Sequence, residues 1–336
     1  MRYAIWNNKG GVGKTFLTFV IACDYAVCHP DRKVVMLDLC PQANLSEIVL
    51  GGNGKGAENL SNLIESHKTI GGYFDARISS PQQRTGTETD FQINDLKKYN
   101  PHLPDNASLV AGDPSLEIQA QTINQISAQT LPTNSWANVH RWLMDLISAI
   151  QTKQPNSVFF IDCNPSFAAY TELAIVAAER LIIPCTADGS SARAIDNVGR
   201  LVYGTGNANE YGDATFNKKA LHNQFSLPAI HKIALNRGTQ YSKRASKSFG
   251  AMFKEVENRV NKLQQSANPI QFSSSESEMF LEMPDAHNVA VVCSYEGVPL
   301  SQLKIGPHKM HQETVQVNPE PLDRYKEALS KLVSTL

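Results

Sequence analysis

The fold of this chain is decided by residues 2–15, whose sequence is RYAIWNNKGGVGKT. Residues 2–6 predict a short strand that runs straight into a glycine-rich turn. From Lys14 to about Cys28, apolar residues recur at helical spacing, which predicts a helix. Residues 33–39, KVVMLDL, are an apolar run that predicts a second strand. Strand, loop, helix and strand in this order are typical of a parallel βαβ crossover.

Further apolar runs extend this pattern along the chain. They predict buried strands at Ser108–Ala111, Val158–Ile161, Leu181–Cys185 and Lys232–Leu235. Helical patterns separate most of them, so we expect an α/β fold, a doubly wound and mostly parallel sheet with helices on both faces. Residues 51–56 are glycine-rich, and residues 79–106 are polar with several prolines and glycines. We therefore expect a single domain over residues 1–336, with an elaborated segment at about 51–150.

The composition, with 42% hydrophobic and 19% charged residues, is that of a globular protein. A net charge of −1 gives no global attraction to nucleic acid or anionic lipid, so any such binding needs a local patch. The six cysteines form no C-x-x-C pair, which argues against a disulfide framework and a zinc ribbon. His308 and His311 lack a nearby third ligand, and we expect them in a polar loop. No apolar run approaches the ~20 residues of a membrane span, and the first residues do not resemble a signal peptide. We expect a cytoplasmic protein.

The glycine-rich turn has the composition of a phosphate-binding loop. Glycines let the backbone wrap close to phosphate so that successive N–H groups point inward. The N-terminus of the helix that follows adds partial positive charge. A lysine then reaches the β- and γ-phosphates, and a hydroxyl binds Mg²⁺. Lys14 and Thr15 supply these two groups, so the expected fold is that of a P-loop NTPase.

The loop departs from the common pattern G-x-x-x-x-G-K-[ST], because Asn8 stands where the first glycine belongs. It matches the variant K-G-G-x-G-K-[ST], whose chance occurrence in a chain of this length is on the order of one in ten thousand, too rare to be fortuitous. In this loop the chain resembles the ParA/MinD family of deviant Walker ATPases. The resemblance implies ATP and Mg²⁺ as cofactors and a homodimer formed on ATP binding, in which Lys9 reaches the partner subunit's nucleotide. The residues expected to contact nucleotide here are Lys9, Gly10, Gly11, Val12, Gly13, Lys14, Thr15 and Phe16.

Residues 38–44, DLCPQAN, resemble the switch segment D-x-D-P-Q-x-N of that family. Asp38 fits, and we expect it to act with Lys9 and Lys14 as a catalytic group. Cys40 stands where the family carries the aspartate thought to orient the attacking water. A thiol lacks the charge of a carboxylate and is a poor acceptor, so we expect slow hydrolysis with ATP binding preserved. The alternative is that another group activates the water and Cys40 is merely tolerated.

Residues 158–162, VFFID, form an apolar run that ends in a carboxylate. An aspartate at the end of such a strand lies beside the P-loop and holds Mg²⁺ directly or through water. With the following CNPS, the segment resembles the family's D-x-P-P-S motif, which makes Asp162 the Walker B candidate. The alternative is an aspartate that caps the next helix. We expect the metal to be held by Thr15, Asp38 and Asp162.

Two later segments extend the resemblance. Residues 232–236, KIALN, are similar to the family strand whose terminal asparagine reads adenine, which implies Asn236. Residues 283–300 resemble the closing segment whose first part packs on the base, which implies Pro284 and Asp285. An asparagine after a strand is also an ordinary turn residue, and that alternative stays open.

A basic stretch follows Asn236. Residues 237–262 hold seven basic residues against two acidic ones, and much of the stretch predicts helix. ParA-like proteins bind DNA nonspecifically, and phosphate contacts supply such affinity. The candidates for DNA contact are Arg237, Lys243, Arg244 and Lys247. The alternative is a solvated helix face.

The last residues form an apolar stripe at helical spacing, which predicts a final helix docked on the core rather than on a membrane. The leading hypothesis is therefore a ParA-like ATPase in DNA segregation or cargo positioning, with a ParB-like or other regulatory protein partner. It would be nucleoid-associated where DNA binding holds. The second hypothesis is a nucleotide-gated scaffold that barely hydrolyses ATP and recruits a protein partner through residues 51–150.

Overall fold

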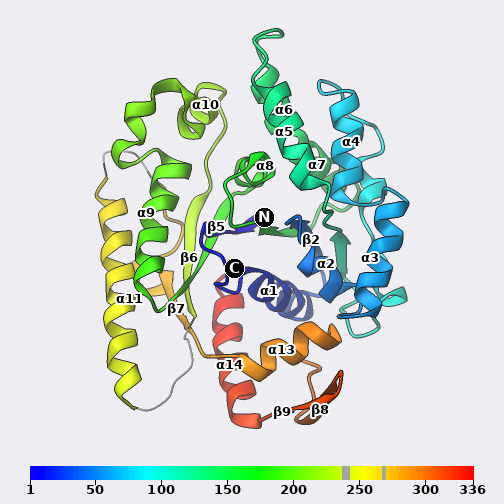
Figure 1. Ribbon diagram of the computed structural model, residues 1–336, viewed down its shortest axis with the longest axis vertical. Helices are drawn as coiled ribbons and strands as arrows, with labels where there is room; N and C mark the ends of the chain where they lie inside the picture. Colours follow the sequence, from blue (N-terminus) through cyan, green and yellow to red (C-terminus); the bar gives the residue numbers. More distant parts are fainter. Residues whose placement is uncertain (237–242, 267–269) are drawn as a thin grey trace.

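The computed structural model describes residues 1–236, 243–266 and 270–336, and a seven-stranded sheet runs through its centre (Figure 1). The strand order is β3-β2-β4-β1-β5-β6-β7, and every neighbouring pair in it is parallel. The strands are β1 (Arg2–Ile5), β2 (Lys33–Leu39), β3 (Ala107–Val110), β4 (Ser157–Cys163), β5 (Arg180–Thr186), β6 (Ala229–Asn236) and β7 (Phe280–Met283). The predicted α/β fold with a parallel sheet is confirmed.

Helices cover both faces of the sheet. They are α1 (Lys14–Cys28), α2 (Asn44–Val49), α3 (Lys55–Glu65), α4 (Ile70–Ser79), α5 (Leu116–Ser127), α6 (Ser135–His140), α7 (Trp142–Lys153), α8 (Ala169–Ala177), α9 (Gly189–Tyr203), α10 (Phe216–His222), α11 (Lys243–Gln264), α12 (Glu276–Met279), α13 (His287–Glu296) and α14 (Pro319–Val333). Short 3-10 helices span Glu88–Phe91, Leu96–Lys98 and Gly206–Ala214. Figure 1 shows α1 and α14 on one side of the sheet and α5 to α8 on the other.

Side-chain alternation along the strands produces two hydrophobic cores. On β1, Tyr3 and Ile5 belong to the core shared with α1 and α14, whereas Ala4 belongs to the core shared with α4 to α11. Successive residues of a strand point to opposite faces, so a strand buried on both faces must be apolar throughout. This is why the parallel strands read as uninterrupted apolar runs in the sequence.

Several predicted bounds agree with the structure. The helix at Lys14–Cys28 and the strand at Lys33–Leu39 are confirmed with the bounds predicted. Two features were not predicted: strand β7, and an antiparallel hairpin of β8 (Gly306–Met310) and β9 (Glu313–Val317). The expectation of a polar loop is wrong for His308, which lies on β8, whereas His311 does lie in a loop, the turn of the hairpin.

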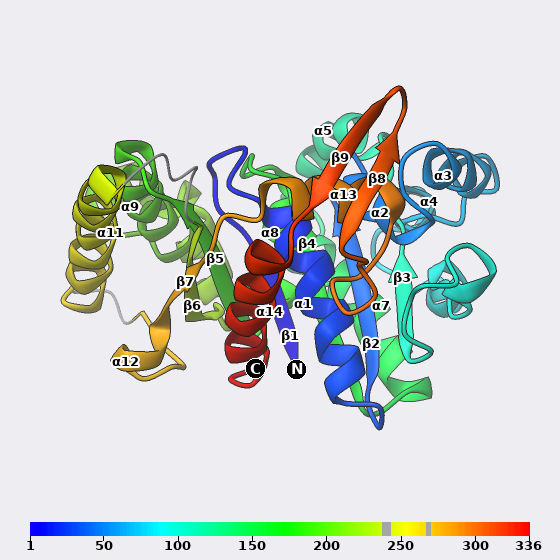
Figure 2. The same cartoon turned by 90° about the horizontal axis from the view of Figure 1, so that it is seen from below.

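The C-terminal helix α14 packs against α1 (Figure 2). Its apolar stripe is buried, including Tyr325, Leu329 and Leu332. Beyond the helix, the carbonyl oxygen of Leu336 accepts a hydrogen bond of 2.6 Å from the Tyr3 hydroxyl of β1. The predicted docking of this helix on the core is confirmed. Within the described ranges, no helix has the length and apolar character that crossing a membrane requires.

Candidate nucleotide-binding site

The P-loop connects β1 to α1 at the edge of the sheet where the parallel strands end. Gly13 precedes α1 with a φ of 82°, and Gly11 has a φ of 73°, a backbone region that favours glycine. A Cβ built on Gly10 or Gly11 would meet no other atom within 4 Å. The glycines therefore face open space, and the loop leaves room for a phosphate group at the N-terminus of α1.

Lys14 lies across the inside of the loop. Its ammonium donates hydrogen bonds to the carbonyl oxygens of Asn7 (3.1 Å) and Lys9 (2.9 Å), and the residue is 7% exposed. Burial lowers the pKa of Lys14, and the nearby carboxylate of Asp162 partly opposes this shift. The lysine is thus held at the loop by neutral carbonyl groups, which an anionic phosphate can replace as its partner.

Thr15 and Asp162 meet beside Lys14. The Thr15 hydroxyl donates a 2.7 Å hydrogen bond to Oδ2 of Asp162, and the Thr18 hydroxyl lies 3.3 Å from Oδ1. Asp162 is next to last on β4, and its register partner on β2 is Asp38. Burial raises the pKa of both carboxyls, and the charge of Asp38 raises that of Asp162 further. A divalent cation would relieve this repulsion, since carboxylate and hydroxyl oxygens suit Mg²⁺. Mg²⁺ keeps several waters and phosphate oxygens as ligands, so few protein ligands suffice.

Asp38 organises the segment that follows β2. Its Oδ1 accepts the backbone N–H of Cys40 (3.1 Å), and its Oδ2 accepts both the backbone N–H (2.9 Å) and the hydroxyl (2.8 Å) of Ser46. The Ser46 hydroxyl in turn accepts the backbone N–H of Gly112 at 2.7 Å. Because both of its oxygens bind protein donors, Asp38 is placed to hold the 40–46 segment against the site. Sequence reasoning missed Ser46, whose role depends on contacts with β2 and the end of β3.

Cys40 lies in this segment and is 8% exposed. Burial and the neighbouring Asp38 raise the pKa of its thiol to about 12. The thiol is therefore neutral at physiological pH and offers no anionic acceptor to a water molecule.

Lys9 lies on the other side of the loop, against the end of β5. Its ammonium contacts the carboxylate of Asp188 and donates a 2.6 Å hydrogen bond to the Thr186 hydroxyl. The Ser191 hydroxyl of α9 lies 3.4 Å away. Sequence reasoning did not find these partners, because they lie about 180 residues further along the chain. Their only local signal is an aspartate and serines that cap a helix after a strand.

The residues predicted to contact adenine also lie at this edge of the sheet, where strands β6 and β7 end. The Asn236 side chain donates a 2.6 Å hydrogen bond to the Val12 carbonyl of the P-loop. Asn236 is the register partner of Met283, so Pro284 and Asp285 follow directly beside it. Phe16 turns instead to α14, with its ring 5.6 Å from that of Tyr325.

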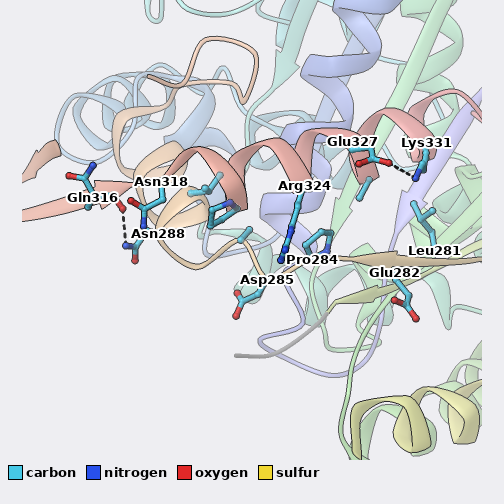
Figure 3. Close-up of a pocket in the computed structure, with 14 residues that line it drawn as sticks. Leu281, Glu282, Pro284, Asp285, Asn288, Gln316, Asn318, Arg324, Glu327 and Lys331 are labelled. Atoms are coloured by element: carbon cyan, nitrogen blue, oxygen red, sulfur yellow. Dashed lines mark hydrogen bonds and ion pairs between the residues drawn. The ribbon is translucent and has the colours of Figure 1, made fainter. Parts of the chain in front are cut away.

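Pro284 and Asp285 line an open groove of about 980 Å³ between the β7–α13 connection and α14. Figure 3 shows Arg324 of α14 extending beside Pro284. The groove continues along α14 to Lys331, which pairs with Glu327 at 2.7 Å. The two predicted base-side residues are therefore accessible from solvent.

From Lys243 onward, the basic stretch lies on α11. Arg237 falls outside the described residues, and the side chains of Lys243, Arg244 and Lys247 are not described. Arg259 pairs with Glu255 on its own helix and with Asp196 of α9, each at 2.8 Å. The charge count along residues 237–262 thus overstates the free positive charge, because α9 brings an acidic partner to Arg259.

Comparisons with known proteins agree with this geometry. A family described as an AAA domain matches residues 2–208, more than half of the chain. None of the curated protein sequences matches the chain. The structure of apo McdA from Cyanothece is similar, with a TM-score of 0.58 at 17% identity over 98% of each chain. The structure of a McdA variant from Cyanothece bound to ATP has a TM-score of 0.57 at 16% identity, and the match covers 98% of this chain and 95% of that one. The structure of a plasmid partition protein from Borrelia burgdorferi has a TM-score of 0.50 at 14% identity, and the match covers 100% of this chain and 99% of that one.

The chain therefore belongs to the family described as an AAA domain, and it shares its fold with the McdA and plasmid partition structures. At identities below a fifth, the likeness to the solved structures is one of fold.

Proposed function

We propose that this chain is a ParA-like ATPase that binds Mg²⁺ and ATP and dimerises around the nucleotide. In this state it binds DNA without sequence preference, and a ParB-like or other regulatory protein controls its release, as in DNA segregation or cargo positioning. The observation that carries the proposal is the meeting of Lys14, Thr15 and Asp162 beside an open glycine loop. McdA bound to ATP and a plasmid partition protein are among the structures with this fold.

Each residue has a physical role in this proposal. Lys14 and the N-terminus of α1 offer positive charge to the β- and γ-phosphates. Thr15 and Asp162 supply oxygen ligands for Mg²⁺, and Asp38 holds the switch segment beside them. Mg²⁺ bound there supplies positive charge against the phosphate oxygens. Asn236, Pro284 and Asp285 lie at the adjoining strand ends, where we place the base.

We also propose that hydrolysis is slow, because the neutral thiol of Cys40 occupies the position of a carboxylate. A general base contributes about 10²–10⁴-fold to a rate when it is correctly placed. We further propose that residues 1–336 form one cytoplasmic domain.

Removal of the Lys14 charge tests nucleotide binding. Lys14→Ala should weaken ATP binding at least tenfold, measured by isothermal titration calorimetry with Mg²⁺ present. Lys98→Ala is the matched control, because the Lys98 side chain is 76% exposed and pairs only with Asp95 in the part of the chain that the structure describes. Normal ATP affinity in Lys14→Ala would refute the proposal.

The second candidate function is a nucleotide-gated scaffold that binds ATP with little turnover and recruits a protein through residues 51–150. The neutral, buried thiol of Cys40 favours it. Turnover of a Cys40→Asp variant separates the two candidates.

A further inference from the structure

The ammonium of Lys9 rests in a set of three polar groups, Thr186, Asp188 and Ser191, which we call the Lys9 cradle. β1 and β5 are neighbours in the sheet, so the loop after β1 and the residues after β5 lie side by side. Asp188 supplies the charged contact, and the two hydroxyl groups complete it. The cradle belongs to the same chain as Lys9.

The cradle is fixed by its own hydrogen bonds. Asp188 is the N-cap of α9, and its Oδ1 accepts the backbone N–H groups of Ser190 and Ser191, each at 3.0 Å. The Thr186 hydroxyl donates to Oδ2 of Asp188 at 2.9 Å, and the Thr186 backbone N–H donates to the Ser191 hydroxyl at 3.0 Å. One carboxylate oxygen is thus occupied by the helix end, and the other is directed at Thr186 and Lys9.

The electrostatics keep the carboxylate ionised. Burial alone would raise the pKa of Asp188, but hydrogen bonds from Lys9, Ser190 and Thr186 hold it well below its usual range. The side chains of Lys9 and Asp188 are 23% and 47% exposed. An ion pair this exposed is worth little in water, so a phosphate group can displace the carboxylate from Lys9.

We propose that Asp188 is a positioning residue that holds Lys9 on its own subunit, and that Lys9 must leave this carboxylate before it contacts a nucleotide phosphate. The proposal rests on the proposed function, in which Lys9 binds nucleotide. The carboxylate and the phosphate compete for one ammonium, so the ion pair raises the ATP concentration that binding requires. By linkage, a competing contact in the free state weakens the apparent affinity for ligand.

Asp188→Asn tests this inference, because asparagine keeps the N-cap acceptor of α9 and removes the charge that binds Lys9. We expect ATP to bind about 3- to 10-fold more tightly to this variant than to the wild type, measured by calorimetry with Mg²⁺. The increase should disappear in the Lys9→Ala background, because the ammonium is then gone. Asp188→Glu should restore most of the wild-type affinity. Ser190→Ala is the control, since the Ser190 hydroxyl bonds Asp188 at 2.6 Å, whereas the ammonium of Lys9 bonds Thr186, Asp188 and Ser191.

The outcomes separate this inference from the proposed function. Equal ATP affinity in wild type and Asp188→Asn, with weaker binding in Lys9→Ala, overturns the inference alone. An effect of Asp188→Asn that persists in the Lys9→Ala background also overturns it, since the effect then bypasses Lys9. Unchanged ATP binding and unchanged oligomeric state in Lys9→Ala overturn the proposed role of Lys9 itself. Thermal denaturation of each variant verifies that α9 remains folded.

Discussion

Asp38 and Asp162 are register partners on the adjacent parallel strands β2 and β4, and both carboxyl groups are buried. Burial raises the pKa of both carboxyl groups, and the charge of Asp38 raises the pKa of Asp162 further. The Thr15 hydroxyl contacts only the Asp162 member of the pair in the described structure, whereas Ser46 contacts Asp38. The two carboxylates therefore contact different segments: Asp162 bonds the residue that follows the P-loop lysine, and Asp38 bonds the segment that follows β2.

The first prediction concerns the dependence of ATP binding on Mg²⁺. Asp162→Asn keeps the size of the side chain and removes the charge that attracts the cation. The quantity compared is the ratio of the ATP affinity with Mg²⁺ to the ATP affinity with chelator, measured by calorimetry. We expect this ratio to be at least tenfold smaller in the variant than in the wild type. Asp105→Asn, at a position 85% exposed, is the control. An unchanged Mg²⁺ effect in Asp162→Asn would place the metal elsewhere.

The second prediction concerns hydrolysis. Cys40→Asp introduces a carboxylate beside the loop, and we expect it to raise kcat about 10²-fold in steady-state phosphate release. Cys40→Asn is the control, because it has the same shape without the charge. ATP affinity should change little in either variant. An unaltered kcat in Cys40→Asp would show that water is not activated at position 40.

The candidate residues predicted from local patterns, Lys14, Thr15 and Asp162, are ones that the structure brings together. Lys14 and Thr15 follow a glycine loop at fixed spacing, and Asp162 ends an apolar run, so each is recognisable from a few neighbouring residues. Ser46 and Asp188 were missed, because their roles come from contacts across strands that no local pattern records.

Burial on both faces decides which strands were predictable from the sequence. β1, β2 and β4 are buried on both faces and are apolar throughout, so their positions were predicted. In the β8–β9 hairpin, GPHKM and ETVQV, one face carries Met310, Val315 and Val317, which pack against a hydrophobic core, and the other face is polar and exposed. So few apolar residues, divided between two five-residue strands, make an apolar alternation too short for prediction from the sequence.

The third prediction concerns the pH dependence of stability. His231 bonds the Thr335 carbonyl (3.1 Å) and the Ser273 hydroxyl (2.9 Å), and it is buried beside Tyr3. Burial lowers its pKa from 6.5 to about 4. Between these pH values, His231 therefore binds a proton more readily in the unfolded chain than in the folded one. The contribution of His231 to the free energy of unfolding is complete above pH 6.5 and is lost as the pH drops towards 4.

His231→Gln retains an N–H donor and cannot be protonated. We expect it to reduce the loss of unfolding free energy between pH 6.5 and 4 by about 2–3 kcal/mol at most, measured by urea denaturation across this range. His222→Gln is the control, since His222 lies on the surface of α10. If the two variants show the same pH profile, His231 does not carry this dependence.

The fourth prediction concerns DNA. If α11 contacts DNA phosphates in the ATP-bound state, replacing Lys243, Arg244 and Lys247 by alanine should weaken binding equally for all sequences. Each lost phosphate contact reduces the slope of log affinity against log salt concentration by about 0.9. Fluorescence anisotropy of a random-sequence duplex, with ATP, ADP or no nucleotide and over a salt series, measures both effects. Arg259→Gln, on the same helix, should change the slope little because Asp196 and Glu255 already neutralise Arg259. ATP-dependent binding with a steep slope that the triple variant flattens supports a DNA-bound state. Absence of binding under every condition makes α11 a solvated face, and the scaffold then becomes the leading function.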